Sequence, residues 1–147
     1  VEQGSEVDTS DWLTYTNEQM GVQFDYPNEW TLGEYYSGYA WEKKYNESSA
    51  WVSFIEPNGE KVVISRGRAE TIEEETSEAT EVEYTNITYT DIYGYNAAEV
   101  KSINMFVNDE TRTETWIEIN GDLIRMPDIK EFPELEYVIA SFEITDQ

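Results

Sequence analysis

The sequence predicts an α+β fold in which an antiparallel β-sheet of about seven strands is covered by helices. Short runs of alternating apolar and polar residues are separated by tight-turn signals, as in strands joined by hairpins. A helix-start signal stands near residue 71, in the middle of the chain. The last apolar segment repeats every three to four residues, as one face of a helix does.

Length and composition predict a single domain. The chain has 147 residues, 39% of them hydrophobic, and it contains 5 Trp, 11 Tyr and 5 Phe. A chain of this length and aromatic content buries a sizeable core. Residues 1–11 are polar and acidic and show no periodicity, so we expect a flexible tail or linker there and one domain over residues 12–147.

The first well-patterned strand is predicted at residues 22–26. Val22, Phe24 and Tyr26 alternate with polar residues, which is typical of a half-buried strand. Pro27 cannot donate a ladder hydrogen bond, so it ends the strand. Trp30 is placed to fold back over the strand end.

The other strands are predicted from β-rich runs and from the turns between them. Turn signals stand at 57–59 (Pro-Asn-Gly), at Gly94 and at 120–121 (Asn-Gly), where both residues tolerate the positive φ of a type I′ turn. Residues 35–45 form either an edge strand or a long aromatic loop. The remaining strands are expected at 12–15, 50–56, 61–65, 87–90, 97–107, 111–119 and 122–126.

Two helices are predicted. Thr71 as N-cap and Glu74 at the third helical position fit a capping box, followed by a short acidic helix to about residue 79. The closing helix, 133–142, begins with Pro133 in its first turn, where the missing N–H is not needed. Its apolar stripe consists of Leu135, Val138, Ile139 and Phe142.

The charge of the chain excludes some partners. There are 32 Asp and Glu against 9 Lys and Arg, a net charge of −23. Such a chain is repelled by the phosphates of nucleic acids and by anionic membrane surfaces. The acidity itself indicates either solubility in a saline or cation-rich environment or a specific cation-binding role.

Residue types that are missing from the sequence exclude several chemistries. The chain has no Cys and no His, so it cannot form disulfides, Ser-His-Asp or Cys-His catalytic sites, or zinc sites of the Cys/His kind. The common phosphate-binding glycine loops are missing as well. Paired carboxylates, as in a glycosidase, remain as the enzymatic alternative, although 32 acidic residues place some pair at any distance by chance.

An acidic segment suggests a cation site, and Ca²⁺ is the cofactor we expect if there is one. Calcium takes six to eight oxygen ligands. The candidate ligands are Glu70, Glu73, Glu74 and Glu78, in a segment that also holds Glu75, Glu81 and Glu83. No EF-hand loop is present, and glutamates at such spacing are also typical of a solvated helix face.

An aromatic segment suggests a binding platform. Its side chains would stack on sugar rings or on a peptide, so the expected partner is a carbohydrate or a protein. The alternative is that they pack into the core and cover an edge strand. The candidate residues are Tyr35, Tyr36, Tyr39, Trp41 and Tyr45.

Three segments together resemble the PsbP-like fold family, which includes the Mog-type Ran-binding proteins. They are 15–30, with its apolar strand, Tyr-Pro and nearby Trp; 92–98, with a Gly-x-x-Ala turn; and 138–142, a helix end in Ser-Phe. The resemblance implies an antiparallel sheet between helices. Many bacterial members are small secreted or lipid-anchored proteins, photosystem members assist calcium and chloride retention, and Mog-type members bind a small GTPase.

No residue of this chain matches a partner-binding residue of either branch, so neither specific function is carried over. We expect a non-enzymatic, extracytoplasmic binding or accessory domain, the soluble part of a secreted protein or lipoprotein behind a removed signal peptide. The alternative is a hydrolase that works through carboxylates. A deep cleft with two buried, unpaired acids would favour the hydrolase, and a shallow aromatic or acidic surface would favour binding.

Overall fold

The fold is given by a computed structural model that describes residues 8–37, 50–67, 70–77, 82–104 and 110–145. Within these residues the strands are β1 (Leu13–Asn17), β2 (Val22–Tyr26), β3 (Thr31–Ser37), β4 (Ala50–Ile55), β5 (Lys61–Arg66), β6 (Val82–Ile92), β7 (Tyr95–Asn104), β8 (Glu110–Ile119), β9 (Asp122–Pro127) and β10 (Glu143–Ile144). The helices are α2 (Ile72–Ser77) and α3 (Leu135–Ser141).

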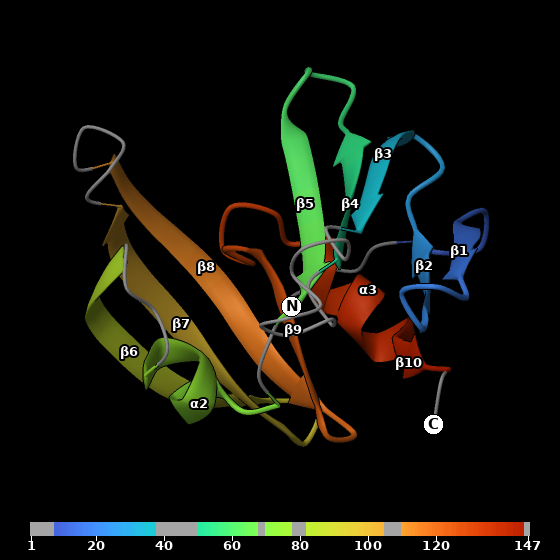
Figure 1. The fold of residues 1–147 in the computed structure, drawn as a ribbon. Helices are drawn as coiled ribbons and strands as arrows, with labels where there is room; N and C mark the ends of the chain where they lie inside the picture. The colour runs from blue at the N-terminus through green and yellow to red at the C-terminus, as the bar shows by residue number, and fades with distance from the viewer. Residues whose placement is uncertain (1–7, 38–49, 68–69, 78–81, 105–109, 146–147) are drawn as a thin grey trace.

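The strands form two antiparallel sheets (Figure 1). The larger has seven strands in the order β3-β4-β5-β9-β8-β7-β6, so that β3 and β6 are its two edges. The smaller has the order β1-β2-β10 and joins the two ends of the domain. The α+β class and the antiparallel sheet of seven strands are confirmed, and the separate three-stranded sheet is an addition to the prediction.

Local signals account for most elements. In β2, Val22, Phe24 and Tyr26 are buried and alternate with partly exposed residues, as predicted. Asn120 and Gly121 have φ of 50° and 88°, which confirms the turn between β8 and β9. The Oγ1 atom of Thr71 accepts a hydrogen bond from the Glu74 N–H at 3.1 Å, which confirms Thr71 as the helix cap; the Glu74 carboxylate accepts from the Glu70 N–H instead of the Thr71 N–H of a complete capping box.

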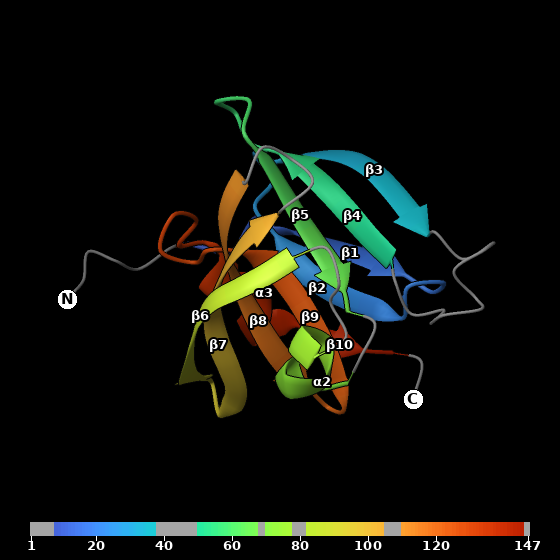
Figure 2. The same ribbon diagram turned by 60° about the vertical axis from the view of Figure 1, so that its left-hand side comes forward.

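The two helices lie on opposite faces of the seven-stranded sheet. In Figure 2, α2 lies in front of the long strands and α3 lies behind them. Neighbouring residues of a strand point to opposite faces, so Ile117 and Ile124 contact the α3 side whereas Trp116 and Leu123 contact the α2 side. Each helix therefore covers a core of its own.

The main core lies between the seven-stranded sheet and the layer formed by α3 and the three-stranded sheet. All four apolar residues of the predicted α3 stripe are buried in it. Phe24 of β2 stacks on Phe142 with ring centroids 5.2 Å apart, and the Ser141 hydroxyl accepts a hydrogen bond from the Asp25 N–H. Trp30 is buried beside Phe54, which also contacts Tyr26 at the end of β2.

The second core lies on the other face, under α2. It consists of buried Ile72, Ala98, Val100, Trp116 and Leu123, with partly buried Tyr84 and Ile87 packed against them. It is the smaller of the two, and α2 supplies only Ile72 and Glu75 as buried residues.

One arginine fastens the small sheet to the large one. Arg66, at the end of β5, donates to the Met20 carbonyl at 2.6 Å and to the Asp122 carboxylate at 2.7 Å. Met20 precedes β2, and Asp122 begins β9. Because a charged donor strengthens both hydrogen bonds, this side chain holds three segments together.

Several boundaries differ from the predictions. Residues 31–37 form strand β3, so the edge-strand alternative for the aromatic segment holds for its first part. The β6 strand begins at Val82, five residues before the predicted run, and α2 ends at Ser77 within the described residues. None of the helices in the described part of the chain has the length and apolarity to span a membrane.

Candidate functional site

A cleft of about 830 Å³ lies along the β6 edge of the seven-stranded sheet. We call it the edge cleft. One wall is the second half of β6 and the turn that follows it, and the other is the segment between β9 and the start of α3. The lining residues are Thr88, Tyr89, Thr90, Asp91, Ile92, Tyr93, Ala98, Glu99, Thr115, Asp128, Ile129, Lys130, Pro133 and Glu136.

The floor of the edge cleft is polar because the main core ends there. One row across the sheet, Ala97, Ile117 and Ile124, is apolar and buried in the main core. In the neighbouring row, β7 and β8 have Glu99 and Thr115 instead, next to Thr88 of β6, while β9 still places Met126 in the main core. On β7 and β8 the same face of the sheet thus changes from core to cleft within one step along the strand.

A two-residue turn fixes the β6 wall. Tyr93 and Gly94 have φ of 53° and 84°, the left-handed conformation of both residues in a type I′ turn. The Asp91 carboxylate accepts a hydrogen bond from the Gly94 N–H at 3.0 Å, which stabilises the turn. Tyr93 is held at the end of the hairpin with 56% of its surface exposed.

The opposite wall is fastened to the sheet by two contacts. The buried Thr115 hydroxyl accepts a hydrogen bond from the Ile129 N–H at 3.1 Å. The Lys130 ammonium lies 3.1 Å from the Glu99 carboxylate. Asp128 closes the local turn by accepting a hydrogen bond from the Lys130 N–H.

The edge cleft is negatively charged and has an aromatic rim. Its lining contains four carboxylates, those of Asp91, Glu99, Asp128 and Glu136, and one lysine. Partial burial, followed by the charges of Glu136 and Tyr137, raises the pKa of Tyr93. Tyr89, half exposed on the same strand, has its pKa raised by partial burial and then by Glu73 and Glu118.

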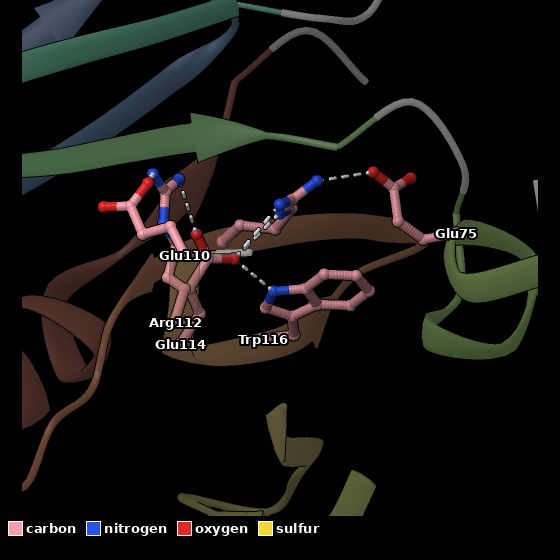
Figure 3. A network of polar contacts seen from close by, with 6 residues as sticks. Glu75, Glu110, Arg112, Glu114 and Trp116 are labelled. Carbon is pink, nitrogen blue, oxygen red and sulfur yellow. Dashed lines mark hydrogen bonds and ion pairs between the residues drawn. The ribbon is translucent and has the colours of Figure 1, made fainter. Parts of the chain in front are cut away.

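A charged network lies on the other face of the sheet and belongs to the second core. Figure 3 shows Glu75 extending toward it from α2, while Glu114 and Trp116 extend from β8. Arg125 of β9 contacts Glu75 at 2.9 Å and Glu114 at 3.1 Å, and its guanidinium lies 4.4 Å from the centre of the Trp116 ring.

The electrostatics of Arg125 follow from these neighbours. Its desolvation favours the neutral form, but the carboxylates of Glu114 and Glu75 outweigh this effect and raise the pKa of Arg125. The Trp116 indole N–H also donates to Glu114, at 2.7 Å. Because every group in this network is engaged by another, we assign it to structure rather than to binding.

The predicted aromatic platform lies mostly outside the described residues. Tyr35 is partly buried and packs against the main core. Tyr36 stands in β3, and its side chain is not described; Tyr39, Trp41 and Tyr45 lie outside the described residues. The platform therefore stays a prediction.

The structure describes three of the four predicted calcium ligands, and it does not bring these three together into a metal site. Glu70, Glu73 and Glu74 are exposed, and Glu78 lies outside the described residues. Glu74 accepts a hydrogen bond from the Glu70 N–H at 3.3 Å. In the described part of the chain no group of three or more acidic side chains is placed to hold a metal ion. The calcium site stays a prediction.

Sequence reasoning missed the edge cleft because its two walls are about forty residues apart in the chain. The alternation of Thr88, Tyr89 and Thr90 indicated a strand and nothing more. One signal was present in the sequence, namely a threonine-rich strand whose two faces are both polar or aromatic, as expected at a sheet edge and unusual in a covered strand.

The sequence matches no protein-family model and no curated protein. Among solved structures, the chain is similar to the solution structure of cyanobacterial PsbP (CyanoP) from Synechocystis sp. PCC 6803, with a TM-score of 0.48 and 16% sequence identity over 94% of this chain and 95% of that chain.

Proposed function

We propose that this chain is a non-enzymatic binding domain whose ligand carries positive charge and occupies the edge cleft. The observation that carries the proposal is the composition of the cleft lining, with four carboxylates and two exposed tyrosines around a single lysine. That lysine is already paired with Glu99. A cationic ligand would meet an excess of negative charge along both walls, which favours its approach and its orientation.

The hydrolase alternative is less well supported by this cleft. A glycosidase needs one carboxylic acid that burial keeps protonated beside a second, ionised carboxylate. In the edge cleft, Asp91 and Glu136 are exposed, Asp128 accepts a hydrogen bond from the turn, and Glu99 is paired with Lys130. Because these acids are exposed or already engaged and lie beside exposed tyrosines, the cleft supports binding rather than hydrolysis.

Location outside the cytoplasm, as part of a secreted protein or lipoprotein, is the second part of the proposal. It is supported by the sequence resemblance alone. Fractionation of cells that produce the full-length protein tests it, and recovery only with cytoplasmic markers would contradict it.

Titration of the ¹⁵N-labelled protein with a lysine decapeptide tests the binding site. We expect amide shifts concentrated at residues 88–93 and 128–136, with a glutamate decapeptide as the negative control. Shifts spread evenly over the acidic surface would show only general charge attraction and would sink the proposal.

A pair of charge reversals makes this test specific. Glu136→Lys removes an exposed carboxylate from the cleft lining, and Glu143→Lys removes one that is also exposed from β10. Both variants change the net charge by the same amount. Since an exposed ion pair contributes up to about 1 kcal/mol, we expect Glu136→Lys to weaken peptide binding about fivefold and Glu143→Lys to change it by less than about twofold.

A further inference from the structure

We propose, on the basis of the proposed function, that the ligand is an extended basic segment of another protein that binds as an added strand along β6. The sheet would gain an eighth strand beside its free edge. Binding of this kind combines main-chain hydrogen bonds with pockets for alternate side chains. Three features of β6 support it: the direction of its backbone groups, the regularity of its edge and the charge on both sides.

The register of the hairpin fixes which backbone groups face outward. In a two-residue turn of this type, the flanking residues Ile92 and Tyr95 exchange both hydrogen bonds, and bonded pairs then alternate along the strands. Thr90 and Thr88 are therefore bonded to β7. The N–H and C=O groups of Ile87, Tyr89 and Asp91 point the other way, and among the described strands β6 pairs only with β7.

The edge cleft runs along this same stretch. Six consecutive residues of its lining, 88–93, come from β6 and its turn. Consecutive residues of a strand point to alternate faces, so a cleft lined by all of them lies at the strand edge and not on one face of the sheet. The floor of the cleft, with Glu99 and Thr115, lies on the α3 face, so an added strand would turn every second side chain toward it.

The two edges of the sheet differ in regularity. The β3 edge has a register shift between Leu32 and Tyr35, and a Ser53 hydroxyl accepts a hydrogen bond from the Glu34 N–H inside that irregularity. Such bulges blunt an edge against further pairing. The shift in β6 lies between Tyr84 and Asn86, so residues 87–92 form an uninterrupted stretch.

The negative charge around β6 favours a basic segment over a second copy of this chain as the added strand. The lining of the edge cleft has four carboxylates, and on the α2 face Glu73 and Glu118 lie close enough to Tyr89 to raise its pKa. A second copy of this chain would bring the same acidic edge and a net charge of −23. Like charges across an interface are unfavourable, so we assign the edge to a segment in which Lys or Arg alternates with β-branched residues.

Hydrogen exchange with a decapeptide of alternating lysine and threonine tests this inference. The amides of Ile87, Tyr89 and Asp91 should exchange at least about tenfold more slowly when the peptide is bound, because they gain hydrogen bonds. The amides of Thr88 and Thr90 serve as internal controls, since they are already bonded to β7.

Two N-methylated peptides provide a second test that does not depend on protein variants. In the bound peptide, the residues opposite Ile87, Tyr89 and Asp91 would form the backbone hydrogen bonds, and the residues between them would point into the cleft. If the lysines occupy the cleft, the threonines form these hydrogen bonds. N-methylation of the threonine amides then removes several hydrogen bonds and should weaken binding at least about tenfold. N-methylation of the lysine amides should change it by less than about threefold.

The outcomes separate the two proposals. Strand addition would be overturned if the peptide shifts amides at the cleft but both methylations weaken binding equally. It would also be overturned if the amides of Ile87, Tyr89 and Asp91 do not exchange more slowly. Either result would leave a site for a cationic ligand. No shift at the cleft would sink the proposed function and this inference together. Protection of the same amides in a peptide-free dimer would overturn the inference in favour of a second copy.

Discussion

The two cores of the seven-stranded sheet are closed in different ways. In the main core, Phe54 contacts the rings of Tyr26, Tyr15 and Phe24 at centroid distances of 4.6, 5.8 and 5.9 Å. In the second core, Trp116 is covered on one side by an arginine that bridges two carboxylates. The first core therefore depends on filled volume, and the second on keeping opposite charges together.

The difference also explains where the candidate site lies. The α3 layer covers apolar positions of the sheet and stops where β6, β7 and β8 have Thr88, Glu99 and Thr115, which leaves the edge cleft open. On the opposite face, α2 is fastened by the Glu75–Arg125 pair and by the Ile72 N–H, which donates to Glu118 at 2.9 Å. Charged side chains thus hold α2 on one face of the sheet, whereas carboxylates line the open cleft at the β6 edge.

The largest expected effect is that of Phe54→Ala in the main core. Phe54 is fully buried, and its removal leaves a cavity among rings that cannot easily collapse. We expect the free energy of unfolding to fall by about 3–5 kcal/mol, measured by urea denaturation. Leu32→Ala is a matched control, because Leu32 faces Phe54 across β3 and β4 but is 49% exposed. It should cost less than about 1 kcal/mol, and equal losses in the two variants would contradict volume filling as the cause.

A smaller loss is expected from Arg125→Met in the second core. The variant leaves the carboxylates of Glu75 and Glu114 next to each other without their cation. Breaking a fully buried pair costs about 3–5 kcal/mol, and the 30% exposure of the Arg125 side chain reduces this to about 2 kcal/mol. Arg112→Met is the control, because Arg112 is 57% exposed and its ion pairs are long.

A double-mutant cycle shows whether charge pairing is the cause. Glu75→Gln removes one carboxylate from the network, so it should relieve part of the loss caused by Arg125→Met. We expect the two changes to be non-additive by at least about 0.5 kcal/mol. Additive losses would mean that Arg125 acts only through packing on Trp116.

The sequence predicted those parts of the fold that local residues determine. The alternation in β2, the Asn120-Gly121 turn, the Thr71 cap and the apolar stripe of α3 are each set by neighbours in the chain, and all are confirmed. The three-stranded sheet could not be predicted in this way. It pairs Ile144 with Val22, and no local signal specifies a pairing across more than a hundred residues.

The candidate site was less predictable than the fold for the same reason. Its walls meet because Thr115 and Glu99 hold Ile129 and Lys130 against the sheet, and these are contacts between distant segments. Aromatic density predicted a platform at residues 35–45, whereas the rim of the edge cleft has Tyr89 and Tyr93, which do not belong to an aromatic-rich segment of that kind. The position of the cleft depends on where the α3 layer ends over the sheet, and no local sequence pattern predicts that position.

The smallest effect concerns the pH dependence of the second core. Burial raises the pKa of Tyr84 above its ordinary value of 10.0. Arg125 lowers this pKa and Glu75 and Glu114 raise it, but burial has the largest effect. The folded state then keeps a proton that the unfolded state loses, so the stability contributed by this proton is present below about pH 10 and is lost as the pH rises through the folded pKa. Denaturation midpoints measured at alkaline pH should therefore fall less steeply in Tyr84→Phe than in the wild type. Arg125→Met should steepen the fall, because it removes the cation that lowers the pKa of Tyr84. An unchanged slope in both variants would mean that Tyr84 is solvated in the folded protein and is not part of the second core.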